Sequence, residues 1–334
     1  MGNTFRNDVR SRACRIIAAT LLGSAALAAV TPLAVAQTYP ARQIRFIVAS
    51  SPGGTTDTLA RRLGERVSKE LGQPVVVENM PAASAVIAAR TVAKAPADGY
   101  TVLIGTNTSH SSNPSMVKDP GYDPVADFAP VALLGLASLV ITVHPSVQAT
   151  TVKDLIAYAK ANPGKLTFAS GTGSARIAGE YFKSEAKVDI VSVPYKSNAQ
   201  GMTDVIGGHV LMIFGDTPLV LPHIRSGAVR GIAVTSAQRS SLVPDLPTIK
   251  EAGLPNYELV GWVGAFVPAG TPPAVIQTLN EAIQKPLREK EFGDGLRAVG
   301  IEPSPSTPAQ LAQFVNVELK RWGDIVRGAG IKPE

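Results

Sequence analysis

A short apolar run, a glycine turn and a helix start follow one another between residues 44 and 57, and this succession limits the fold more than any other stretch. Residues 44–48 are typical of a buried strand, and the Pro-Gly-Gly turn at 52–54 follows. Thr55 or Thr56 is expected to cap the next helix, with Asp57 in its first turn. Because the first N–H groups of a helix lack internal partners, this arrangement can bind an anion. It is also compatible with a turn that merely reverses the chain.

The first 36 residues are typical of a secretory signal peptide. Four arginines precede an alanine-rich apolar run, which ends in the small-x-small sequence Ala34-Val35-Ala36. An uncleaved membrane anchor is the alternative, because the run is nearly long enough to cross a bilayer. Pro32 and the Ala-x-Ala ending favour cleavage after Ala36, so the sequence predicts an exported protein.

The rest of the chain has a mild composition. The only cysteine, Cys14, belongs to the signal segment, so no disulfide is expected in the mature protein. The segment also holds four arginines and one aspartate, and without them the net charge falls from +6 to +3. Such a small excess, with no basic cluster among aromatic residues, argues against nucleic-acid binding. The remaining 298 residues are enough for two domains.

Strand and helix patterns alternate along these residues, which predicts an α/β fold with mostly parallel sheets covered by helices. Apolar runs at 131–134 and 139–143 are expected to cross to a second domain, and residues 262–266 to cross back. The predicted domains are therefore residues 37–137 with 262–334, and residues 138–261. Three C-terminal helical patterns between residues 272 and 325 are expected to pack on the first domain.

Two further stretches have the character of ligand-binding loops. Hydroxyl and amide side chains fill residues 105–113, directly after the predicted strand at 101–104, where an open α/β sheet binds its ligand. A second strand, glycine turn and helix start occurs around residues 170–174, Ser-Gly-Thr-Gly-Ser. The chain thus contains two turns of the same anion-binding type.

Catalytic and cofactor chemistry has little support. The four histidines lack the spacing that would place two imidazoles on one helix face, so no metal site is predicted. Ser109 and His110 are neighbours, which does not make a nucleophile and its base, and no Gly-x-Ser-x-Gly turn occurs. Neither glycine turn has the motif of a nucleotide site. A secreted serine hydrolase using one of residues 109–112 is the disfavoured alternative, and we predict no cofactor and no catalytic residue.

Short motifs along nearly the whole mature chain resemble, in order, those of the Bug-type periplasmic solute receptors of tripartite tricarboxylate transporters. They include residues 44–57, Glu78-Asn79, Asp98-Gly99-Tyr100, residues 193–196 and residues 268–272. The resemblance implies a two-domain Venus-flytrap fold with crossing strands, closing on a small carboxylate in the periplasm. It implies transfer of the solute to membrane components of a transporter; an orphan receptor that reports to a sensor protein is the alternative. We expect a monomer.

The two loops that hold the ligand in that family correspond to residues 49–57 and 170–174. The first loop departs from the family pattern, because Ala49, Ser50, Ser51 and Thr55 replace two prolines, a phenylalanine and a glycine. Hydroxyls therefore stand where the family has an aromatic wall, which favours a polar ligand over an aromatic acid. The residues predicted to bind the ligand are Ser50, Ser51, Gly53, Gly54, Thr55, Thr56, Asp57, Ser84, Thr106, Ser170, Gly171, Thr172, Gly173, Ser174, Arg176, Tyr195 and Asp216.

Two of these residues, and the neighbouring Lys196, have competing interpretations. Arg176 would either contact a ligand carboxylate or pair with Glu180 four residues on. Asp216 would either face the cleft, accepting from a water or a ligand ammonium, or cap the helix that starts at Pro218. Tyr195 and Lys196 would both line the cleft at a strand end, and the alternative for Lys196 is a solvated side chain.

Overall fold

The computed structural model describes residues 39–81, 85–328, 330 and 333. The predicted signal peptide, its cleavage site after Ala36 and the predicted site residue Ser84 lie outside these ranges. Within them, no helix is both long enough and apolar enough to span a membrane.

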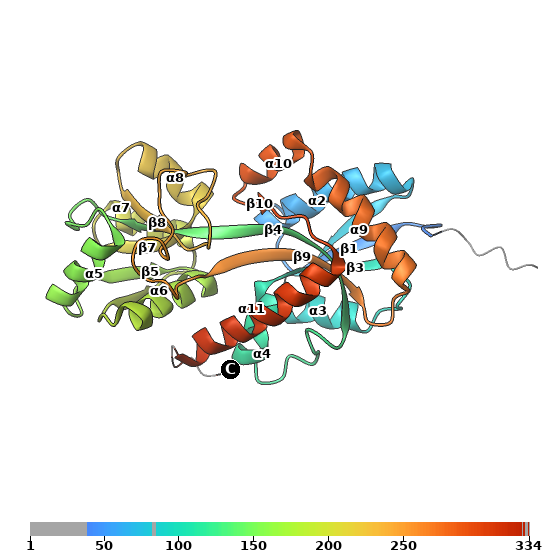
Figure 1. The fold of residues 1–334 in the computed structure, drawn as a ribbon, viewed down its shortest axis with the longest axis horizontal. Coiled ribbons are helices and arrows are strands. Elements are labelled where there is room, and N and C mark those ends of the chain that lie inside the picture. The colour runs from blue at the N-terminus through green and yellow to red at the C-terminus, as the bar shows by residue number, and fades with distance from the viewer. Residues whose placement is uncertain (1–38, 82–84, 329, 331–332, 334) are drawn as a thin grey trace, which may run out of the picture. The chain divides into compact units, whose positions relative to one another are not determined.

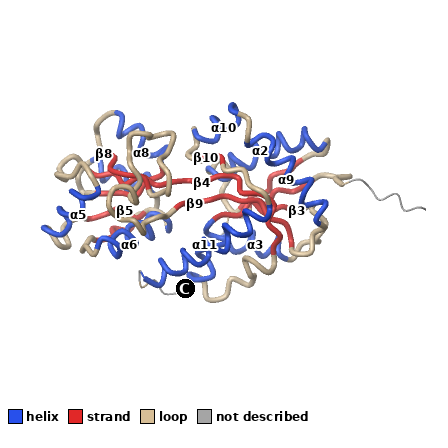
Figure 2. The backbone as a smooth tube through the Cα atoms, viewed as in Figure 1, coloured by secondary structure: helices blue, strands red, loops and turns tan. Residues whose placement is uncertain are grey.

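The strands form one ten-stranded sheet in the order β2-β1-β3-β9-β4-β7-β5-β6, with β8 and β10 also paired to β4. Helices flank the strands (Figures 1 and 2). The strands are β1 Ile44–Val48, β2 Val75–Asn79, β3 Thr101–Thr106, β4 Phe128–Val143, β5 Thr167–Ser170, β6 Val191–Pro194, β7 Met212–Asp216, β8 Arg230–Val234, β9 Val260–Pro268 and β10 Glu302–Pro303.

The helices alternate with the strands, as the sequence patterns predict. They are α2 Thr55–Leu71, α3 Val86–Ala93, the π-helix η2 Thr108–Ser112, α4 Asn113–Met116, α5 Val152–Ala161, α6 Gly173–Ala186, α7 Asn198–Ile206, α8 Thr217–Arg225, α9 Pro273–Leu287, α10 Lys290–Arg297 and α11 Pro308–Gly328. Helix α2 buries Leu59, Leu63 and Val67, which recur every four residues along one face of the helix.

Strand β4 connects two halves of the sheet. Its residues 128–138 pair with β9, and its residues 139–143 pair with β7 and β8. The two apolar runs predicted as separate crossing segments are thus parts of one strand of 16 residues. The first half contains β1 to β3 and β9, and the second half contains β5 to β8. β4 and β9 lie side by side as the long central strands of Figure 1.

The expectation of mostly parallel sheets is only partly correct. β1 pairs in parallel with β2 and β3, and β5 pairs in parallel with β6 and β7. β4 and β9, however, are antiparallel to each other and to their outer neighbours. The sheet is mixed because each long strand passes from one half to the other in the direction opposite to its partner.

Helix α11 contacts both halves, whereas the sequence patterns assigned it to the first domain alone. Its Leu311 and Val315 pack with Trp262 of β9, and its Trp322 and Val326 belong to the buried core of the second half. A helix of 21 residues is about 31 Å long, which is enough to reach both cores.

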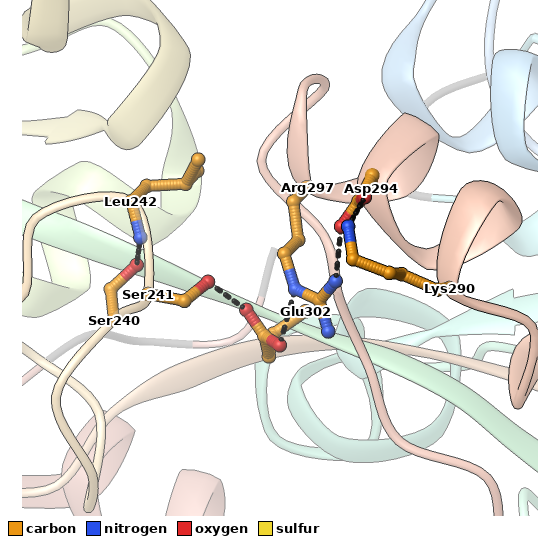
Figure 3. A network of polar contacts seen from close by, with 7 residues as sticks. All are labelled: Ser240, Ser241, Leu242, Lys290, Asp294, Arg297 and Glu302. Atoms are coloured by element: carbon orange, nitrogen blue, oxygen red, sulfur yellow. Dashed lines mark hydrogen bonds and ion pairs between the residues drawn. The ribbon is translucent and has the colours of Figure 1, made fainter.

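A polar network connects the segment after α10 to the second half of the sheet (Figure 3). Glu302 of β10 accepts from Arg297 Nε at 2.8 Å and from Ser241 Oγ, in the loop after β8, at 2.7 Å. Gly300, two residues before Glu302, lies against Pro218 at the start of α8. These contacts hold residues 298–301 beside the cleft described next.

Candidate functional site

A cleft of about 630 Å³ lies along the long strands and is lined from both halves of the sheet. The first half supplies the starts of α2 and η2, and the second half supplies the starts of α6, α7 and α8. The polar lining residues are Thr55, Thr56, Thr58, Thr106, Asn107, Ser138, Thr172, Ser174, Asn198, Asp216 and Thr217. Apolar side chains of the long strands, residues 298–301 and both tryptophans of the protein, Trp262 and Trp322, complete the wall.

The predicted turn between β1 and α2 is present, but its capping differs from the prediction. Gly54, not Thr55 or Thr56, occupies the N-cap, and it has no side chain to accept from the helix. Gly53 adopts φ +81°, a left-handed conformation that favours glycine. Thr55 and Thr56 are thus the first two helical residues and line the cleft, so their amides lie where internal acceptors are missing.

The Asp57 side chain is hydrogen-bonded to the turn and does not line the cleft. It is 2% exposed and accepts from the Gly53 amide at 2.8 Å, from Arg61 Nε at 3.0 Å and from Asn79 Nδ2 at 2.8 Å. Burial raises the pKa of Asp57, but the hydrogen bonds from Arg61, Gly53 and Asn79 outweigh it, and the net pKa is lowered. Its position at a helix start suggested a ligand contact, but both carboxylate oxygens accept hydrogen bonds from within the protein: Oδ2 from Gly53 and Arg61, and Oδ1 from Asn79.

We predict that Asp57→Asn lowers the free energy of unfolding by about 1–3 kcal/mol at pH 7, because a buried charge-assisted network loses its acceptor. A folded-state pKa below the unfolded value of about 3.9 stabilises the protein above that pH, and this stabilisation is lost as the pH falls through the folded pKa. The difference between variant and wild type should therefore shrink below about pH 4. Urea unfolding at pH 7 and pH 3 measures it.

Asp98→Asn serves as the control, since it loosens an exposed ion pair with Arg42. It should change stability by less than about 0.5 kcal/mol. An Asp57→Asn protein as stable as this control at pH 7 would contradict the structural role of Asp57.

The second predicted turn, between β5 and α6, is also present. Thr172 is the N-cap of α6, and its Oγ1 accepts from the Ala175 amide at 3.2 Å. Thr172 and Ser174 line the cleft. A Cβ on Gly171 would lie 2.0 Å from the carbonyl carbon of Ser197, so only glycine fits where the two loops cross. The cleft therefore faces two helix starts of the same type, one from each half of the sheet.

Helices α7 and α8 add two more helix starts to the cleft, and only that of α8 was expected there, through Asp216. Asn198, 5% exposed, begins α7, and its Oδ1 accepts from the Gly171 amide at 3.2 Å. The neighbouring Ser197-x-x-Gln200 sequence is a capping signal that could have located this helix start: the Ser197 hydroxyl accepts from the Gln200 amide at 3.3 Å. Asn198 lines the cleft and is a residue that sequence reasoning missed.

Asp216 has features of both of its interpretations. It occupies the N-cap position of α8 but makes no capping hydrogen bond with its side chain. The carboxylate lines the cleft and accepts from Asn198 Nδ2 at 3.3 Å. Among the described residues that line the cleft, it is the only ionisable one.

Several other predicted residues do not line the cleft. Ser170 is 8% exposed, and its Oγ bonds to the Val193 carbonyl and the Ser192 hydroxyl. Tyr195 donates to Asp204 at 2.6 Å, and burial together with Asp204 raises the pKa of Tyr195 to about 12. Predicted residues outside the lining are Ser50, Ser51, Gly54, Asp57, Ser170, Gly171, Gly173, Arg176 and Tyr195.

Neither interpretation of Arg176 is seen. The side chain is exposed and does not line the cleft, and the described residues show no ion pair between it and Glu180. Lys196 is also exposed, in agreement with its solvated alternative.

The hydroxyl-rich stretch after β3 is mostly buried. Only Thr106 and Asn107 of this stretch line the cleft. Residues 108–112 form a π-helix, and residues 109–112 of it are buried. His110 stacks on Phe266 with ring centroids 3.9 Å apart. Burial lowers the pKa of His110 to about 3. The serines next to this packed imidazole are buried with it.

Ser109 Oγ lies 2.9 Å from His110 Nδ1, so these sequence neighbours do contact each other. Ser109 is 1% exposed, His110 is fully buried, and the serine hydroxyl also bonds the backbone of Thr106. A substrate cannot reach this pair. The described residues also contain no group of three potential metal ligands.

Comparison with known proteins identifies the family. The model of the tripartite tricarboxylate transporter family receptor matches residues 59–331. The chain belongs to this family. It is a non-enzymatic periplasmic solute-binding receptor of tripartite tricarboxylate transporters, as the sequence motifs predicted. Protein BugT of Bordetella pertussis is 37% identical over 300 residues, which cover 89% of this chain and 92% of BugT.

Solved structures agree with the fold. R. palustris Rpa4515 with adipate is 36% identical, with a TM-score of 0.75 over 89% of this chain and 100% of that chain. MatC from Rhodopseudomonas palustris with bound malate is 29% identical, with a TM-score of 0.70 over 86% of this receptor and 100% of MatC. The predicted periplasmic-binding-protein fold is thereby confirmed.

Proposed function

We propose that this receptor captures a small carboxylated solute in the cleft of about 630 Å³ and delivers it to the membrane components of a tripartite transporter. The observation that carries the proposal is that the starts of α2, α6, α7 and α8 open on one cleft whose described lining residues include no basic side chain. Unpaired helix amides and hydroxyls supply the attraction for an anion.

The related structures support this chemistry, since one contains adipate and another malate. The carboxylate is expected at the amides of Thr55 and Thr56 from one side and of Gly173 and Ser174 from the other. The predicted domains, residues 37–137 with 262–334 and residues 138–261, would close around it, which excludes water and strengthens these hydrogen bonds.

A thermal-shift screen of mono-, di- and tricarboxylates against matched amides and alcohols tests the proposal. A ligand at one hundred times its dissociation constant adds about 2.7 kcal/mol to the folded state, which raises Tm by several degrees. Because both tryptophans line the cleft, their fluorescence should change with the same ligands. If no carboxylate at millimolar concentration alters Tm or fluorescence, the proposal is wrong.

Two further expectations concern the exported protein. Signal-peptide cleavage after Ala36 would leave Gln37 as the first residue, and the mass of the receptor purified from the periplasm measures this. We also propose that the mature receptor is a monomer, which its mass in solution tests.

A further inference from the structure

Asp216 is unusual because it places a negative charge in a cleft built to attract anions. Its Oδ2 accepts from Asn198 Nδ2 at 3.3 Å, and no ion pair joins it to a basic side chain within the described ranges. A carboxylate with one amide donor keeps further acceptor capacity, because two oxygens offer about four lone-pair sites. The cleft thus combines helix amides that favour an anion with a fixed acceptor that repels one.

Asn198 fixes the place of this acceptor. Its Oδ1 accepts from the Gly171 amide, so its Nδ2 is directed to Asp216. Gly171 belongs to the turn that starts α6, whose first amides lie at the cleft. One short chain of hydrogen bonds therefore ties the acceptor to the proposed carboxylate site. Asn198 is a positioning residue, since it is nearly buried and packed against the Gly171 backbone.

We propose that Asp216 is a specificity-determining residue, which selects carboxylic acids that also carry a hydrogen-bond donor, a hydroxyl or an ammonium group, over the unsubstituted acids. This inference rests on the proposed function of the cleft. Family membership does not decide the point, because malate carries a hydroxyl group and adipate carries none. Asp216 is exposed in this structure, so water can satisfy its free oxygen there. When the cleft closes and excludes water, the donor of a substituted acid satisfies that oxygen, whereas an unsubstituted acid leaves the charge unpaired.

Matched acids of equal chain length test the inference. Isothermal titration compares propionate, lactate and alanine; succinate, malate and aspartate; and glutarate, 2-hydroxyglutarate and glutamate. The wild-type receptor is expected to bind a donor-bearing member of at least one series at least tenfold more tightly than its unsubstituted partner. In Asp216→Asn and Asp216→Ala, this preference should fall to threefold or less.

Asp189→Asn is the control, because it removes the same charge from an exposed site in the second half that does not line the cleft. It should keep the wild-type preference. Equal affinity for substituted and unsubstituted acids, or a preference that survives in both Asp216 variants, overturns the role of Asp216 and leaves carboxylate capture standing. If the wild-type receptor binds none of these acids and none in the wider screen, both proposals fall together.

Discussion

A receptor with Ser174→Asp is expected to lose at least about 100-fold of its affinity for carboxylates while keeping or gaining stability. Ser174 is the second residue of α6 and lines the cleft. A new carboxylate there would stand about 4 Å from a bound one, and two such charges repel by about 4 kcal/mol at an effective dielectric constant of 20. A factor of 100 corresponds to about 2.7 kcal/mol, so the loss should exceed it.

The same substitution favours the helix, because a negative charge near a helix N-terminus contributes about 0.3–1 kcal/mol. The carboxylate affinity measured by titration calorimetry should therefore fall, whereas the free energy of unfolding measured in urea should stay the same or rise. Ala274→Asp is the matched control: it places the acid at the second position of α9, exposed and away from the cleft. Affinity within threefold of wild type in the Ser174 variant would show that the start of α6 does not hold the anion.

Local sequence signals located the two glycine turns because each depends on neighbouring residues only. A short apolar run, glycines and a polar helix start occur within about ten residues at both places, and the structure has a strand, turn and helix at each. The anion-binding interpretation of both turns thus rests on backbone geometry. The local sequence predicts this geometry well, because glycines and helix-start residues determine it. The positions of Thr55, Thr56, Thr172 and Ser174 at the cleft follow directly from it.

Side-chain direction could not be predicted in the same way. Asp57 has the right position for a helix-start acid, yet it turns back to Gly53 and Asn79 because β2 lies beside β1. Residues 109–112 follow a strand end, yet they are buried, because His110 stacks on Phe266 of β9, which is far away in sequence. In each case a partner far away in sequence decides where the side chain lies.

The contributions of Asn198 and Asp216 depend on strand order. β7 lies between β4 and β5, and the start of α7 crosses the Gly171 loop. Asn198 therefore meets Gly171, 27 positions before it, and Asp216, 18 positions after it. No periodicity in the sequence encodes that order. The family resemblance supplied the two loops and Asp216, and the structure added Asn198 and the hydrogen bonds that join them.

Gly171→Ala is expected to weaken carboxylate binding by at least about tenfold and to lower the free energy of unfolding by about 1–3 kcal/mol. The added methyl carbon would lie 2.0 Å from the Ser197 carbonyl carbon and 2.2 Å from the Asn198 nitrogen, both backbone atoms that cannot turn aside. The start of α7 must therefore move away from the start of α6. The hydrogen bond from Gly171 to Asn198 would lengthen, and Asn198 would lose its fixed orientation toward Asp216.

Gly173→Ala, two residues on, separates this effect from a general intolerance of the loop. A methyl group at Gly173 meets no atom within 4 Å, and alanine keeps the helix amide proposed to face the ligand. This variant should match the wild type in affinity within threefold and should be equally or slightly more stable, because alanine has less backbone entropy to lose. Thermal unfolding and calorimetry of both proteins measure the difference. Wild-type affinity in Gly171→Ala would mean that the crossing of the two loops does not set the geometry of the ligand site, since the crossing cannot survive that methyl group unchanged.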